Sequence, residues 1–302
     1  MKALMLVAVF AVAPVGAAQD PLFQPKTTEK AEKKEVVYLT AWPKLEADAA
    51  TVKTDIERLR KAGTPEMGEQ ADAALTKAGA AIVPQLLPVL GREKSLEARL
   101  RVETVLEKIT GPEHTRLLAP FFADKAREVR IWALARCAGF PDAGVQAPAV
   151  EAYTKAKAAL AKDPKAEGAD VELYCAALCA TAAGSHAALE SIAQSALEQW
   201  GKKGPELRLA LEAVRDEEST TFASKLAADP DRKKKVAGLN LLAGCGTKSA
   251  LALVKVELDN NDNSIRIAAI NALRGIVDGE LPIANLPVFE AIELAKKWKA
   301  RS

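Results

Sequence analysis

A short pattern recurs at a fixed spacing along this chain, and that spacing limits the folds that the chain can adopt. Each copy has an acidic or amide residue in a turn, then a basic residue, then an apolar run. Arg99 and Arg130 are 31 residues apart, and so are Lys235 and Arg266. Each copy also follows a second apolar stretch, so one period holds two amphipathic helices. A period of about 30 to 45 residues built from paired helices is typical of an α-solenoid, in which stacked pairs share one core.

Turns that contain glycine or proline divide the chain at the borders that this period requires. They are GTP at 63–65, TGP at 110–112, FPD at 140–142, KKGP at 202–205 and CGT at 245–247. The sequence therefore predicts an all-α fold, a right-handed α-solenoid of about seven antiparallel helix pairs. A final helix from Leu286 to Arg301, with the charged end AKKWKAR, is expected to cap the stack. The predicted pairs occupy 46–78, 79–110, 112–141, 145–184, 186–218, 220–247 and 249–277.

The composition agrees with closely packed helices. Nearly half of the residues are apolar, but only 5% are aromatic, and Ala and Leu dominate. Both have high helix propensity, and the small Ala side chain lets helices approach each other. The 42 Lys and Arg residues nearly balance the 40 Asp and Glu residues. This balance argues against nucleic acid or an anionic membrane as a partner of the protein as a whole.

Three segments carry the clearest copies: ADKAREVRIWALA at 123–135, DPDRKKKVAGLNLL at 229–242 and NNDNSIRIAAINAL at 260–273. They resemble the second helix of HEAT repeats, including the short bacterial variety, which typically has an acidic turn, then Val-Arg, then Ala- and Leu-rich positions. The unit at 145–184 departs from the pattern because Glu172 stands at the Arg position. The resemblance covers about residues 46–280 and implies a curved helical scaffold that usually binds proteins. It implies no activity, because such a fold hosts many roles.

In three units an Asp or Asn lies six residues before the basic residue. We expect this side chain to accept hydrogen bonds from free N–H groups at the start of the second helix. We expect the cation to pair with that acid or with one in the neighbouring repeat, which forms a ladder along the stack. A basic binding groove is the alternative interpretation. The residues are Asp124 with Arg130, Asp229 with Lys235, and Asn260 with Arg266.

The first residues have the layout of a secretory signal peptide. Lys2 is followed by an apolar run from Ala3 to Val15 and by small residues up to Ala18. We expect export to the periplasm or the cell exterior, with cleavage after Ala18. An uncleaved membrane anchor is the alternative, but the run is shorter than the roughly 20 apolar residues of a spanning helix.

Residues 19–45 are expected to form a flexible tether between residues 1–18, the signal peptide, and the HEAT-like domain at 46–302. Near the end of the tether, VVYLTAWP at 36–43 is apolar. It is expected to form a short strand or an arm packed on the first helix.

One candidate partner-binding face lies on the second helices, which the family resemblance places on the concave side. Two positions after the basic residue, successive units have Arg101, Trp132 and Tyr174. These residue types are frequent anchors in protein interfaces. The alternative is that Trp132 and Tyr174 fill space between repeats.

The chain has few residues suited to catalysis or metal binding. Its two histidines, His114 and His186, have no second His or Cys at metal spacing, and each is expected to be a surface or capping residue. We therefore predict no catalytic residue, metal or cofactor. In an exported protein, Cys137 could form a disulfide with Cys175 or Cys179. The alternative is that these cysteines, with Cys245, fill small core positions.

These features favour a non-enzymatic scaffold of the cell envelope or exterior, which binds one or more envelope proteins and has no membrane span after cleavage. Two alternatives remain. One is an enzyme or enzyme subunit, since some HEAT-like proteins resemble lyases that attach chromophores. The other is a nucleic-acid-binding protein, but its basic patches, around Lys202 and Lys233, are short.

Overall fold

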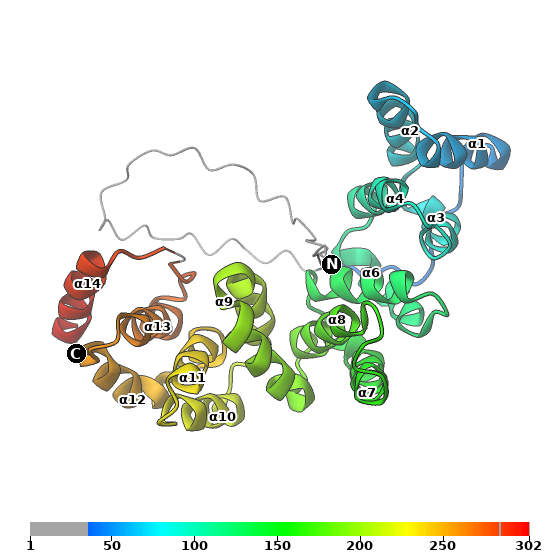
Figure 1. Cartoon of the computed structure of the whole chain (residues 1–302). Coiled ribbons are helices and arrows are strands. Elements are labelled where there is room, and N and C mark those ends of the chain that lie inside the picture. The colour runs from blue at the N-terminus through cyan, green and yellow to red at the C-terminus, as the bar shows by residue number, and fades with distance from the viewer. Residues whose placement is uncertain (1–35, 284, 302) are drawn as a thin grey trace. The chain divides into compact units, whose positions relative to one another are not determined.

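The computed structural model describes residues 36–283 and 285–301. Within these ranges every regular element is a helix and no strand forms, which confirms the predicted all-α class (Figure 1). The predicted signal peptide at 1–18, with its cleavage point after Ala18, lies outside the described residues, as do residues 19–35 of the predicted tether.

Two helix pairs open the described chain, and side-chain caps define where three of their helices begin. The Asp48 carboxylate accepts a hydrogen bond from the backbone N–H of Thr51 (2.8 Å), and Thr64 and Ser95 cap the later helices in the same way. These caps satisfy N–H groups that have no partner inside the helix. The elements are α1 (Ala49–Arg60), α2 (Pro65–Ala78), a 3-10 turn (Gly79–Ile82), α3 (Val83–Leu90) and α4 (Leu96–Ile109).

The next two pairs follow the predicted borders. The turns at 110–112 and 140–142 lie where one helical unit ends and the next begins. In the third unit the first helix is broken into short turns, because Pro112 and Pro120 restrict the backbone. The elements are 3-10 turns at Pro112–His114 and Ala119–Ala123 around α5 (Thr115–Leu118), then α6 (Arg127–Ala138), α7 (Gln146–Lys162) and α8 (Ala169–Ala182).

The fifth predicted pair is wrong, because residues 186–218 do not form two helices. One continuous helix, α9 (Leu189–Glu212), runs through the KKGP sequence at 202–205, where we predicted a turn. Pro205 removes one helical hydrogen bond, which costs about 3 kcal/mol. The helix continues because α9 packs against both α8 and α11, with Ile192 and Leu207 fully buried.

The remaining helices contact their neighbours along the chain. A 3-10 turn at Lys248–Ala250 follows the predicted turn at 245–247, and α13 ends in a π-helical turn at Arg274–Asp278. The helices are α10 (Glu217–Ala227), α11 (Arg232–Cys245), α12 (Leu251–Val256), α13 (Asn263–Leu273) and α14 (Val288–Ala300).

Residues 36–43 form an arm rather than a strand, and the arm packs on the third unit instead of the first helix. The backbone N–H of Leu39 donates to the carbonyl of Glu113 (2.9 Å). The Trp42 ring stacks on His114, with ring centroids 5.7 Å apart, and the Arg116 guanidinium lies 4.0 Å from the Tyr38 ring centroid. The prediction of a free tether is therefore wrong for residues 36–43, because aromatic and backbone contacts fix them.

One apolar core connects the described helices from Val52 in α1 to Trp298 in α14. Along the chain, α6, α8, α9, α11 and α13 each pack on the next of these helices, while α7 and α10 pack on α8 and α11 (Figure 1). Glycine allows the closest crossings. A Cβ atom at Gly275 would lie 2.0 Å from the carbonyl oxygen of Ala243, so the π-helical turn after α13 meets α11 backbone to backbone.

The last helix, α14, is less polar on its outer side than its charged end suggests. It buries Ala291, Leu294 and Trp298, and it packs on α13. Val288, Phe289 and Ile292 nevertheless stay exposed, with Phe289 at 74%. Charged residues at the end of α14 form ion pairs, such as Arg301 with Asp278 at 2.9 Å.

Among the described residues, the stretch Pro65–Leu90 is long enough to span a membrane, and an 18-residue window within it has the mean hydropathy (1.4) of a spanning helix. The stretch consists of α2 and α3, and between them Gly79 has a φ of 69°, in the left-handed region. Its Leu75, Leu86 and Leu90 side chains are fully buried. The apolar side of this stretch is thus part of the core of the first two units.

Candidate interaction surface

Trp132 does not belong to an exposed face. It is 6% exposed and is part of the continuous core, where it fills space in α6. The prediction that it contacts a partner is therefore wrong, and the space-filling alternative describes it. Its place two residues after Arg130 turns its side chain inward, since Val129 and Ala133 on the same helix are also buried.

Arg101 and Tyr174 are half-buried, and each connects two helical units. The Arg101 guanidinium donates from α4 to the carbonyl oxygens of Arg60 (3.3 Å) and Ala62 (3.4 Å). The Tyr174 hydroxyl donates from α8 to the Glu206 carboxylate on α9 (3.1 Å). Burial is the main cause that raises the pKa of Tyr174, and the Glu206 charge is the second. The structure does not gather Arg101, Trp132 and Tyr174 into one site.

The acid or amide of the repeated pattern forms a turn in front of the second helix. Asp124, Asp229 and Asn260 each accept from the backbone N–H two residues later, at 2.8, 2.8 and 2.9 Å. We expected Asp229 and Asn260 to cap their helices, and this prediction is wrong. Asp231 and Asp262 are the N-caps instead. The repeated side chain positions the N-cap residue instead, as Asp and Asn do in Asx turns.

In two units the basic residue of the pattern binds its own turn. Arg130 donates to the Asp124 carbonyl (2.8 Å) and Arg266 to the Asn260 carbonyl (2.7 Å). Arg130 also pairs with Glu172 of α8 at 2.6 Å, so the acid that stands at the basic position of the next unit is its partner.

Lys235 reaches the next unit in a similar way but does not bind its own turn. Its ammonium pairs with the largely buried carboxylate of Glu257, just after α12. Asp229 pairs instead with Lys234 at 3.2 Å. The ladder of ion pairs is therefore present between several units, with partners that sequence spacing alone does not identify.

Arg99, the corresponding residue of α4, makes no ion pair among the described residues, and its Nε is buried without a hydrogen-bond partner. Glu103 lies one turn further along the same helix. Burial raises the pKa of Glu103 to about 7, although the Arg99 charge acts against this rise and Glu107 adds to it.

A surface depression of about 550 Å³ lies between α1 and the α3 region. We call it the α1–α3 depression. Its cationic residues are Lys53, Arg60 and Arg92, and its one carboxylate is Glu57. The rest of the lining is Ala49, Ile56, Gln85 and Val89.

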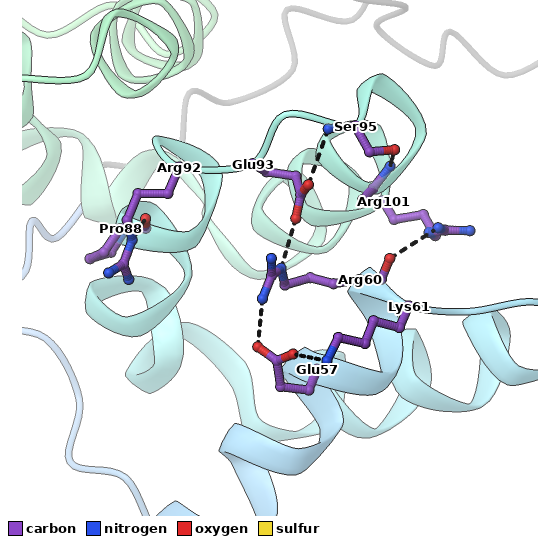
Figure 2. A network of polar contacts seen from close by, with 9 residues as sticks. Glu57, Arg60, Lys61, Pro88, Arg92, Glu93, Ser95 and Arg101 are labelled. Atoms are coloured by element: carbon purple, nitrogen blue, oxygen red, sulfur yellow. Dashed lines mark hydrogen bonds and ion pairs between the residues drawn. The ribbon is translucent and has the colours of Figure 1, made fainter.

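Figure 2 shows the polar network at one end of the α1–α3 depression. Arg60 donates to Glu57 (2.6 Å) and to Glu93 (2.7 Å), and Glu93 also accepts from the backbone N–H of Ser95 (3.1 Å). The Arg60 hydrogen bond holds the pKa of Glu93 below its usual range, and Glu93 raises the pKa of Arg60. Arg101 fixes the same end of α1 through the Arg60 carbonyl (Figure 2).

The sequence reasoning did not single out this depression. Lys53, Ile56 and Arg60 recur at helical spacing on one face of α1, which is a local signal that could have marked the face. Arg92 and Val89 come from a different unit, and nothing in the local sequence shows that they lie opposite α1.

The cysteines and histidines have structural positions. All four cysteines are free and buried, so no disulfide joins Cys137 to Cys175 or Cys179, and burial raises the thiol pKa of each. The buried His114 accepts from the Gly111 N–H through Nδ1 (3.0 Å). His186 contacts Asp216 at 2.8 Å. Over residues 36–283 and 285–301, no three His, Cys, Asp or Glu side chains gather as a metal site would require.

Comparisons with family models, with curated proteins and with solved structures gave no match to this chain. The inferences about its function therefore depend on its own residues and contacts.

Proposed function

We propose that this protein is a non-enzymatic protein-interaction scaffold of the cell envelope or exterior, built as a HEAT-like α-solenoid. The observation that supports it most is the order of helix packing. The helices α6, α8, α9, α11 and α13 each contact the next one along the chain, and ion pairs such as Arg130–Glu172 join consecutive units. Stacking of this kind produces a long surface that is suited to extended partners.

The handedness and the repeated pairing of the solenoid are part of this proposal. One unit, α9, is a single long helix, so the stack would contain an irregular step at that point. A solenoid tolerates such a step, because each unit needs only the helices before and after it for its core.

Crosslinking in the native organism, followed by identification of the proteins that co-purify, tests the proposed function. We expect a reproducible partner from the cell envelope. Recovery of the protein alone, together with turnover of a small molecule by the purified chain, would overturn the scaffold proposal in favour of an enzyme.

Binding to nucleic acid has a direct test of its own. We expect the purified protein not to be retained on DNA at any salt concentration, because the charges of the chain nearly cancel. Retention at low salt that is lost as salt rises would favour the nucleic-acid alternative.

A further inference from the structure

Two cations of the α1–α3 depression have no acidic partner. Lys53, on the exposed side of α1, makes no ion pair or hydrogen bond within the described residues. Arg92 uses its Nε for the Pro88 carbonyl (2.9 Å), which leaves its terminal nitrogens free to donate. The third cation, Arg60, already has two carboxylates, Glu57 and Glu93. The depression therefore has a positive rim with unused donors.

The wall between these cations is apolar. Ile56 is 5% exposed and Val89 is half-buried, so both present methyl groups toward the depression from firmly packed positions. The volume of about 550 Å³ lies within the roughly 300–1,000 Å³ that is usual for ligand sites. A group that fills it should combine an anion with an adjacent apolar side chain or body.

The shape of the site does not depend on a ligand. Arg60 is held by two carboxylates, and Arg101 binds the last carbonyl of α1, so the end wall is fixed (Figure 2). Fixed walls lower the entropy cost of binding, because few side chains have to be ordered.

The number of free cations favours a protein segment over a polyanion. Binding to DNA or RNA commonly uses on the order of 6 to 10 phosphate contacts, whereas the α1–α3 depression offers two unpaired cations. Lys53 and Arg92 are also exposed at the rim, so a segment of a second protein can reach them without any opening of the fold.

We propose that the α1–α3 depression binds a segment of a partner protein in which a carboxylate side chain is next to an apolar side chain. The carboxylate pairs with Lys53 and Arg92, and the apolar side chain packs on Ile56 and Val89. This inference rests on the proposed scaffold function and names the chemistry of one of its contacts.

Isothermal titration calorimetry with the full chain tests this site directly. The probes are the peptide Ser-Glu-Leu-Asp-Leu-Ser and its uncharged analogue Ser-Gln-Leu-Asn-Leu-Ser. We expect the acidic peptide to bind at least about tenfold more tightly than the analogue, and its affinity to fall as salt rises. Equal binding of both peptides, or no binding of the acidic one, would overturn the proposal.

A pair of variants locates the binding. The double substitution Lys53→Gln and Arg92→Gln should reduce the affinity for the acidic peptide about tenfold or more. The control Lys233→Gln and Lys248→Gln changes net charge equally, at two exposed lysines of the C-terminal half, and should leave the affinity unchanged. An equal loss in both variants would show a general charge effect and contradict the site.

The same variants separate this inference from the scaffold proposal. If the wild-type chain captures a partner in crosslinking and the Lys53→Gln, Arg92→Gln chain captures it equally well, the scaffold remains and this site is wrong. If neither chain captures a partner, the scaffold proposal fails instead.

Discussion

Gly238, in the middle of α11, lies where that helix crosses α10 with no room for a side chain. A Cβ atom there would be 2.2 Å from the Ala227 nitrogen and 2.7 Å from the Ala223 carbonyl oxygen. The obstacle is backbone, which cannot rotate away. We expect Gly238→Ala to reduce the free energy of unfolding by about 1–3 kcal/mol, measured by urea denaturation followed by circular dichroism.

Gly201 provides the matched control, because it also lies inside a long helix, α9, but has no atom within 4 Å of the Cβ position. Gly201→Ala should stabilise the protein by about 0.5–1 kcal/mol, since Ala loses less backbone entropy in a helix. If Gly238→Ala also stabilised the protein, the close crossing of α10 and α11 would be incorrect.

Glu103 should make stability depend on pH. Its pKa is about 7 in the folded chain and near 4.5 when unfolded, mainly because burial disfavours the carboxylate. Below about pH 4.5 the side chain is neutral in both states and costs nothing. As pH rises to about 7, the unfolded chain loses this proton first, so the wild type becomes less stable relative to Glu103→Gln, by up to about 2–3 kcal/mol.

Urea unfolding of both chains from about pH 4 to about pH 8 measures this effect. The relevant quantity is the change in the difference between the two free energies of unfolding, so a constant offset from the new amide does not affect it. A difference that stays the same over this range would mean that Glu103 is solvated in the folded chain.

At the scale of elements, α9 is the helix for which sequence and structure disagree. The sequence predicts a turn at 202–205, whereas the structure has a continuous helix there. Pro205 lies inside the helix, so replacing it restores a backbone donor and removes a steric conflict. We expect Pro205→Ala to raise the free energy of unfolding by about 1–3 kcal/mol in urea denaturation.

Pro84, near the first turn of α3, is the control for this substitution. Proline is tolerated there because the missing N–H has no helical partner in any case. Pro84→Ala should therefore change stability by less than about 1 kcal/mol, and in the destabilising direction. A loss of stability in Pro205→Ala that equals or exceeds the loss in Pro84→Ala would indicate that 202–205 is a turn, as its sequence suggests.

The borders of most helices could be predicted from the sequence, but the residues that cap their N-termini could not. Glycine, proline and acidic residues mark turns by local chemistry, which the turns at 63–65 and 110–112 follow. Local chemistry did not distinguish Asp229, which accepts from the Asp231 N–H (2.8 Å), from Asp231, which caps the helix by accepting from the Lys234 N–H (3.0 Å). The prediction of a turn at KKGP was wrong because contacts of α9 with α8 and α11 stabilise the helical conformation, and these contacts are distant in sequence.

For the molecule as a whole, periodicity gave the helical class, because each period must bury two apolar faces. The α1–α3 depression could not be found in this way. Lys53 and Arg92 belong to different units, and both line the depression because α1 and α3 each pack on α4. The packing of the arm at 36–43 could not be predicted for the same reason, since Trp42 stacks on His114, which is distant in sequence, and not on the adjacent helix.

Packing between neighbours also predicts how stability is distributed along the chain. Units in the middle, such as α8 and α11, have packed helices on two sides, whereas α1 and α14 lie at the two ends of the described helices. In hydrogen exchange, the free energy of opening should therefore be highest in α8, α9 and α11 and should decrease toward both ends.

Arg136 provides the test of this gradient at one junction. It extends from α6 to the end of α4, where its Nε donates to the Thr110 hydroxyl (2.9 Å) and Nη2 donates to the Glu107 carbonyl (2.6 Å). We expect Arg136→Ala to lower the opening free energy of amides in α4 by about 1–2 kcal/mol while amides in α11 keep their wild-type rates. Faster exchange by the same factor in α4 and α11 would mean that the chain opens as one cooperative unit, which would also remove the main support for independent stacked units.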